Sequence, residues 1–169
     1  AGTAVDTFSY CVERGDGAFW PTQVGMLFGE DMRPFKAAIY WHAWEGMQSL
    51  MSRGLDPLQV LIDRAHQKGM EFFADLRLGT YGGMDPAHKL AEGGRGFVHP
   101  EVREHQRAVV EELATRYDVD GVELDFTAAF GGTSFYFRPE DVDAYTPEMT
   151  EWVRAASEVV RGRAGRPGQ

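Results

Sequence analysis

Two carboxylates, Glu123 and Asp125, stand within an apolar alternation in the segment YDVDGVELDF, residues 117–126. If this segment is a strand, Glu123 and Asp125 share one face, because side chains alternate between the two faces of a strand. One helical pattern precedes the segment and another follows it, which is typical of a parallel sheet buried on both faces. Carboxylates in such a sheet are costly unless they are paired or used. Glu123 and Asp125 are therefore candidate catalytic residues.

A second segment, MEFFADLRL at residues 70–78, carries charged side chains in the same place. Asp75 and Arg77 lie near its carboxyl end and share one face. In barrels of parallel strands, that end carries the substrate site. We therefore expect Asp75, Arg77, Glu123 and Asp125 to converge there, on strands about 4.8 Å apart. The alternative is structural: Asp75 pairs with Arg77, or Arg77 holds Asp125 as an ion pair.

Four further residues are candidates for substrate binding. His42 and Trp44, in the run WHAWEG, are typical of a sugar-facing loop, and equally of an aromatic-rich helix start in the core. His99 is either a helix-entry residue with a hydrogen bond or part of a loop that lines the site. Tyr136, in the run SFYF, could stack on a sugar ring or pack against its own protein.

Composition limits the partners and cofactors. The chain has 169 residues, of which 43% are hydrophobic, so one domain with a sizeable core is expected. A net charge of −9 disfavours nucleic acid and anionic membranes as partners. The single cysteine, Cys11, cannot form an internal disulfide, and no paired Cys or His spacing indicates a zinc site, so we expect neither a metal nor a cofactor. Membrane-spanning and signal-peptide patterns are absent from the sequence, which leaves the compartment open, a secreted or periplasmic one included.

Strand and helix patterns alternate along the chain. The predicted strands cover residues 5–12, 70–78 and 121–126. Two helices are predicted between the first two strands, one at 41–53 closed by Gly54 and one begun by Asp56 and Pro57 and ended by Gly69. A helix begun by His99 and Pro100 precedes the third strand, and a helix over 147–162, begun by Thr146 and Pro147, follows it. Residues 18–40 follow no clean period and predict a long loop with a short helix.

This order predicts an α/β chain whose three strands form one parallel sheet, in sequence order, with the helices on a single side. A doubly wound sheet would usually show a glycine-rich phosphate turn, and neither GxGxxG nor GxxxxGKS occurs. A complete (β/α)8 barrel needs about 250 residues and eight strands. We therefore expect residues 1–169 to be a single domain that is a fragment of a TIM barrel.

The runs DPLQVLIDRAHQKGMEFFADLRL and HPEVREHQRAVVEELATRYDVDGVELDF carry a resemblance to a known family. Over roughly residues 40–160 the chain resembles the glycosyl-hydrolase-like 10 family and related uncharacterised bacterial (β/α)8 barrels. The resemblance implies that residues 5–12, 70–78 and 121–126 are barrel strands two, three and four, and that Asp125 is the catalytic acid. The sequence departs from the family after Asp125, where Phe126 and small residues replace a second acid or an Arg-containing stretch.

The fourth strand of chitinase-type barrels reads D-G-x-D-x-D-x-E and gives a further comparison. Asp120 and Asp125 match it, but Thr127 stands where the proton-donating Glu belongs, which argues against a chitinase mechanism.

Two function classes follow. The first is glycoside hydrolysis, in which two carboxyl groups about 5 to 9.5 Å apart flank the sugar. Asp125 would be one of them, and the other would be Glu123 or a residue of a later strand outside this chain. The second is a non-catalytic carbohydrate-binding or purely structural half-barrel. In either case we expect the isolated chain to be inactive and to self-associate through its open sheet edges.

Overall fold

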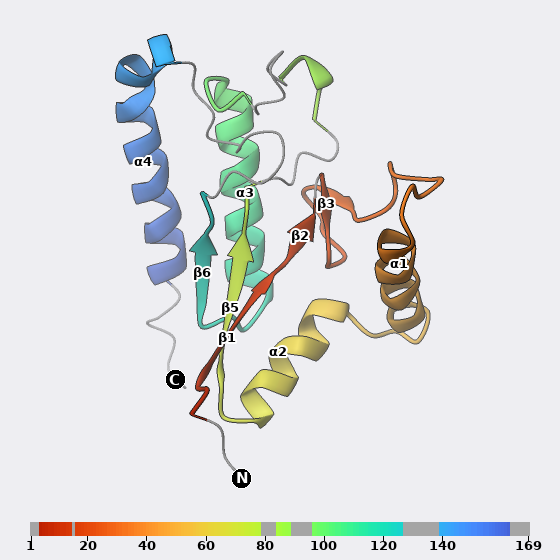
Figure 1. The fold of residues 1–169 in the computed structure, drawn as a ribbon. Coiled ribbons are helices and arrows are strands. Elements are labelled where there is room, and N and C mark those ends of the chain that lie inside the picture. Colours follow the sequence, from red (N-terminus) through yellow and green to blue (C-terminus); the bar gives the residue numbers. More distant parts are fainter. Residues whose placement is uncertain (1–3, 15, 79–83, 89–95, 127–138, 163–169) are drawn as a thin grey trace.

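The computed structural model describes residues 4–14, 16–78, 84–88, 96–126 and 139–162, and it has an α/β fold (Figure 1). Its elements are, in order, β1 (Thr7–Cys11), β2 (Glu13–Arg14), β3 (Gly17–Ala18), β4 (Met26–Leu27), α1 (Ala38–Met51), α2 (Pro57–Gln67), β5 (Glu71–Leu76), the 3-10 helix η1 (Pro86–His88), α3 (Pro100–Arg116), β6 (Gly121–Leu124), the 3-10 helix η2 (Pro139–Asp141) and α4 (Val142–Arg161).

The main sheet has the strand order β1-β5-β6, and both pairings are parallel. Its register places Asp75 between Cys11 on one side and Glu123 on the other. The predicted parallel sheet and its strand order are therefore confirmed, although each strand is shorter than predicted.

The hydrophobic core lies against one face of this sheet. Phe72, Ala74 and Leu76 alternate along β5, all of them fully buried, and they belong to one cluster with buried side chains of the helices. The helix members of that cluster are Leu58, Ile62 and Ala65 of α2, Val102, Val109, Val110 and Leu113 of α3, and Trp152 and Ala156 of α4. The prediction that the helices cover a single side is consistent with this cluster.

The opposite face of the sheet is open to solvent at several positions. Ser9 and Glu123 point to that face, and both are exposed. The expectation that the sheet would be buried on both faces is therefore wrong for the described residues, because their core cluster covers one face alone.

The start of α2 agrees with the sequence analysis. The Asp56 side chain accepts hydrogen bonds from the backbone N–H groups of Leu58 and Gln59, and Pro57 occupies the first turn. Gly69, two residues beyond the end of α2, has a φ of +70°, a backbone conformation that favours glycine. Sequence signals of helix capping thus fixed both ends of this helix.

The last helix begins earlier than predicted. α4 starts at Val142, so Pro147 lies inside it, and the Thr146 hydroxyl donates to the Val142 carbonyl instead of capping a helix N-terminus. Proline costs one backbone hydrogen bond near the start of a helix of 20 residues, and the packing of Trp152 and Ala156 against the core compensates for that loss. A Thr-Pro pair is a common start signal, but here the helix extends beyond it toward the N-terminus, over residues 142–146.

The segment at residues 18–40 is largely the expected long loop, but the expected short helix does not occur before Ala38, and Ala18 and Met26–Leu27 belong to a small sheet. Its order is β2-β3-β4, and no helix occurs between residues 18 and 37, all of which the structure describes. Gly17 packs so closely on Phe28 that an added Cβ would lie 2.4 Å from the Phe28 Cα. The strands are two residues long, too short to produce a visible alternation in the sequence.

This N-terminal segment is attached to α3 through a buried carboxylate. Glu112 accepts hydrogen bonds from Trp20 Nε1 at 3.1 Å, Thr22 Oγ1 at 2.5 Å and the backbone N of Gln23 at 2.6 Å, and it pairs with Arg116. The Glu112 side chain is 4% exposed. Its charge is therefore fully compensated by donors from two distant parts of the sequence.

Among the described helices, none combines the length and the apolar composition that crossing a membrane requires.

Candidate functional site

The candidate site lies on the open face of the main sheet, at the carboxyl ends of β5 and β6. Asp75 is the register partner of Glu123, whose Oε2 accepts a hydrogen bond from Ser9 Oγ at 2.6 Å. Just beyond the two strands, Arg77 Nε donates to Asp125 Oδ2 at 3.1 Å. The Asp125 backbone N donates to the Leu76 carbonyl at 3.0 Å, which holds this pair in line with the sheet.

The predicted convergence of Asp75, Arg77, Glu123 and Asp125 is therefore present. It follows from two features that the sequence shows, the alternation along each strand and the parallel pairing of the strands. The Asp125 side chain is 15% exposed and that of Arg77 is 46% exposed, so the ion pair lies at the boundary between the sheet and solvent.

Asp75 is the unusual carboxyl group of this cluster. Its Oδ1 is buried and has no hydrogen-bond partner among the described residues. Burial raises the pKa of Asp75, and the negative charges of Asp125 and Glu123 raise it further, whereas Arg77 acts in the opposite direction. The cluster thus contains one carboxyl group, Asp75, that is inclined to keep its proton.

The rest of the cluster adds a thiol and a cation. Burial is the main reason that the pKa of Cys11 is raised, and its Sγ donates to the Glu13 carbonyl at 3.2 Å, so this thiol is not an activated nucleophile. The pKa of Arg77 is raised, first by its hydrogen bond to Asp125. Proton transfer at this site would therefore involve the carboxyl groups.

His42 and Trp44 lie elsewhere, inside α1, so their interpretation as a sugar-facing loop is wrong. α1 contacts α2 and lies to the side of the main sheet (Figure 1). His42 is exposed and its ring lies 4.7 Å from that of Trp41. Trp44 packs against Phe35 at 5.9 Å, as an aromatic-rich helix does.

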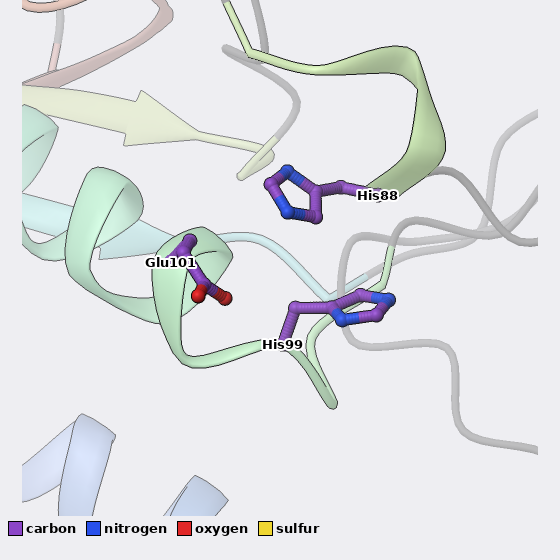
Figure 2. A group of neighbouring side chains, drawn as sticks. All are labelled: His88, His99 and Glu101. Carbon is purple, nitrogen blue, oxygen red and sulfur yellow. The ribbon is translucent and has the colours of Figure 1, made fainter.

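The prediction that His99 is a helix-entry residue is confirmed, and its backbone N–H donates to the Gly96 carbonyl at 2.8 Å. His99 is the N-cap residue of α3, but its side chain makes no capping hydrogen bond. Its ring lies 5.1 Å from the ring of His88. His99, His88 and Glu101 each offer a ligand atom, and these atoms lie within 4.8 Å of one another (Figure 2).

This cluster was missed in the sequence, where no metal site was expected. The spacing from His88 to His99 and Glu101 follows none of the short zinc motifs, since ten residues separate the two histidines. The available signal was weak: two histidines within one long connection, the second next to the start of a helix with an acidic first turn.

Two other residues named in the sequence, Tyr136 and Asp120, lie away from the carboxylate cluster or outside the described residues. Tyr136 lies outside the described residues, as does the loop that follows Phe126. At the opposite end of the sheet, Asp120 Oδ2 accepts from the Phe72 backbone N at 2.7 Å and lies 2.9 Å from His66 Nε2. Asp120 and His66 thus have structural contacts.

A cavity of about 270 Å³ lies among β6, α3 and α4, and none of the clustered carboxylates lines it. Its lining is mainly apolar and includes Val122 and Leu124, which face the helices. Arg161 is the only ionisable residue in that lining. We therefore place the candidate chemistry on the open face of the sheet.

Comparison with known proteins gave no assignment: neither the protein-family models nor the curated proteins include a match to this chain. Its function is therefore inferred from the arrangement of its own residues.

Proposed function

We propose that this chain is part of a glycoside-hydrolase-like (β/α)8 barrel that acts on a carbohydrate, with Asp125 as a catalytic carboxylate. The observation that carries the proposal is the convergence of Asp75, Glu123 and Asp125 with Arg77 at the carboxyl ends of adjacent parallel strands. Active sites of parallel barrels form at that edge. The resemblance to the glycosyl-hydrolase-like 10 family, which rests on the runs that contain these two strands, also favours the proposal.

The topology is compatible with a barrel fragment and also with one half of a doubly wound sheet, and the lack of a glycine-rich phosphate turn favours the barrel. Strand order follows sequence order, so each right-handed crossover moves in the same direction across the sheet. A doubly wound sheet reverses direction and carries helices on both faces. The strand order and the core on one face of this sheet are both what a segment of a barrel wall requires.

The electrostatics of the cluster suggest separate roles for its carboxyl groups. Asp75, whose pKa is raised by burial, would donate its proton to the leaving oxygen as the glycosidic C–O bond breaks. Asp125, beside Arg77, would remain a carboxylate and oppose the positive charge that develops on the sugar. Water then supplies a hydroxyl group to the sugar carbon and returns a proton to the acid.

The alternative is carbohydrate binding without catalysis, and the ion pair between Arg77 and Asp125 favours it. A guanidinium and a carboxylate held together offer donors and acceptors to sugar hydroxyl groups, and the pair is already in place without a ligand. In this case Asp75 would contribute hydrogen bonds only.

Binding and turnover measurements on the purified chain test both candidates. We expect a panel of oligosaccharides to include at least one that binds by calorimetry, with Asp125→Asn weakening its binding about tenfold or more. Asp63→Asn on α2 is the matched control, because Asp63 is an exposed aspartate that only accepts a hydrogen bond from Gln59. Unchanged binding by the Asp125 variant, or no ligand in the panel, would contradict the proposal.

Aryl glycosides separate hydrolysis from binding. We expect no measurable turnover by this chain alone, because three strands leave the site open to water, which removes the low-dielectric surroundings of the acid. We also expect oligomers in size-exclusion chromatography, formed through the open edges of β1 and β6. An active, compact monomer would show that the barrel-fragment interpretation is wrong.

A further inference from the structure

The cluster of His88, His99 and Glu101 shares no residue with the carboxylate cluster of the sheet. His88 ends η1, His99 caps α3, and Glu101 stands in the first turn of α3 (Figure 2). α3 follows β5 and runs back along the sheet, so its N-terminus is at the end of the sheet where β5 and β6 finish (Figure 1).

The backbone holds the two histidines together around Gly96. The Gly96 N–H donates to the His88 carbonyl at 2.9 Å, and the His99 N–H donates to the Gly96 carbonyl at 2.8 Å. A Cβ on Gly96 would lie 2.3 Å from His88 O and 2.4 Å from the Cδ2 atom of His99. Only glycine therefore fits between them, and the close approach of the two rings is built into the backbone.

The neighbouring chain is fixed as well. Arg103 Nη1 donates to the carbonyls of Phe97 and Val98 at 2.9 and 3.1 Å, and the Phe97 ring packs edge-on against Trp152 at 5.2 Å. These contacts anchor the residues between Gly96 and α3 to the core, so His99 and Glu101 project from a rigid support.

Within the described residues, the imidazole groups of this cluster make no hydrogen bond that holds the fold together. His88 Nδ1 is buried and has no hydrogen-bond partner among the described residues, and the His99 ring does not cap α3. A buried nitrogen without a partner is unfavourable by about 1 to 3 kcal/mol. A bound cation would provide the missing partner.

Glu101 has a simpler structural explanation, which accounts for only part of the cluster. A carboxylate in the first turn stabilises a helix through its dipole by about 0.3 to 1 kcal/mol. That effect requires no histidine nearby, whereas two imidazole rings converge with this carboxylate.

We propose that His88, His99 and Glu101 bind a zinc ion. Two imidazole nitrogens and one carboxylate oxygen are a ligand set that zinc uses with water in the fourth position. Tetrahedral bonds of about 2.1 Å place ligand atoms about 3.4 Å apart. The three atoms lie within 4.8 Å of one another, and Glu101 is exposed, so its side chain can turn to close the remaining gap.

The test uses the purified chain after treatment with a chelator, titrated with zinc chloride by calorimetry. We expect one zinc ion per chain, and visible absorption bands of tetrahedral geometry when cobalt replaces zinc. His88→Ala and His99→Ala should each raise the Kd for zinc at least about tenfold and remove those bands. His42→Ala is the matched control, since His42 is an exposed histidine on α1 and should leave the Kd unchanged.

Two further variants keep the outcome decisive. Glu101 is exposed, so Glu101→Gln should preserve the far-ultraviolet circular dichroism spectrum. It should weaken zinc binding about tenfold. Gly96→Ala should separate the histidines and weaken binding in the same direction. The proposal would be overturned if zinc did not bind in a 1:1 ratio. It would also be overturned if the His88, His99 and Glu101 variants bound zinc with the Kd of the unaltered chain. Neither result depends on the carbohydrate assay.

Discussion

Glu112 on α3 is a buried acidic side chain and Asp75 on β5 is a half-buried one with a buried oxygen, and their surroundings differ. Glu112 accepts hydrogen bonds from Trp20, Thr22 and Gln23 and pairs with Arg116. Asp75 has a buried oxygen with no hydrogen-bond partner in the described part of the chain, and like charges stand beside it. A buried carboxylate with a full set of donors joins two parts of a fold, whereas one without them is available to a ligand.

The largest effect is expected at Glu112. Glu112→Ala removes the acceptor shared by Trp20, Thr22 and Gln23, and it leaves the donors of a buried segment without partners. We expect a loss of about 3 kcal/mol in the free energy of unfolding. Urea unfolding followed by tryptophan fluorescence measures it.

The control for that experiment is Glu111→Ala, one residue away on the same helix. Glu111 is exposed and makes an ion pair with Arg107 at 3.3 Å. Its removal should change the free energy of unfolding by less than about 0.5 kcal/mol. Equal losses at positions 111 and 112 would show that the contacts of Glu112 carry no special weight.

A smaller effect, of opposite sign, is expected at Asp75. Asp75→Asn removes a charge that burial and two neighbouring carboxylates disfavour. We expect an unchanged or higher free energy of unfolding at pH 7, with a gain below about 1 kcal/mol because solvent screens this partly exposed site.

The pH dependence gives the sign of that effect directly. The pKa of Asp75 is raised in the folded chain, so its contribution to stability is fully present below the pKa of the unfolded state and is lost as the pH rises through the folded value. The stability of Asp75→Asn relative to the unaltered chain should therefore increase as the pH rises above about 4. Urea titrations at several pH values measure it, and a difference that falls with pH would contradict a raised pKa.

The sequence predicted the positions of these groups better than their properties. Alternation in residues 70–78 and 121–126 placed Asp75 and Asp125 on one face, and parallel pairing followed from the helices between the strands. Local patterns carry that information because strand geometry has a fixed period of two residues. The burial of the Asp75 oxygen depends on neighbours from other strands, which no single segment specifies.

Contacts between distant segments were invisible in the sequence for the same reason. Glu112 lies 90 residues from Thr22, and His88 meets His99 through the turn around Gly96. Local signals determined the elements, and tertiary contacts determined the surroundings of their charged groups.

The smallest effect is expected at Glu104, a solvated carboxylate that completes the series. Its side chain is 65% exposed and its Oε1 accepts a hydrogen bond from Arg107 at 2.6 Å, which lowers the pKa of Glu104. Glu104→Ala should reduce the free energy of unfolding by less than about 0.5 kcal/mol at low salt, and by less at 1 M salt, because the exposed pair is screened.

The pH dependence of Glu104 should run opposite to that of Asp75. A lowered pKa contributes stability above the pKa of the unfolded state, and this contribution is lost as the pH falls through the folded value. The free energy of unfolding that Glu104→Ala loses relative to the unaltered chain should therefore shrink below about pH 4. In that same pH range, the comparison of Asp75→Asn with the unaltered chain should favour the unaltered chain most. Parallel pH profiles for the two variants would mean that burial does not distinguish Asp75 from a surface carboxylate, and the special role of Asp75 at the candidate site would be lost with that distinction.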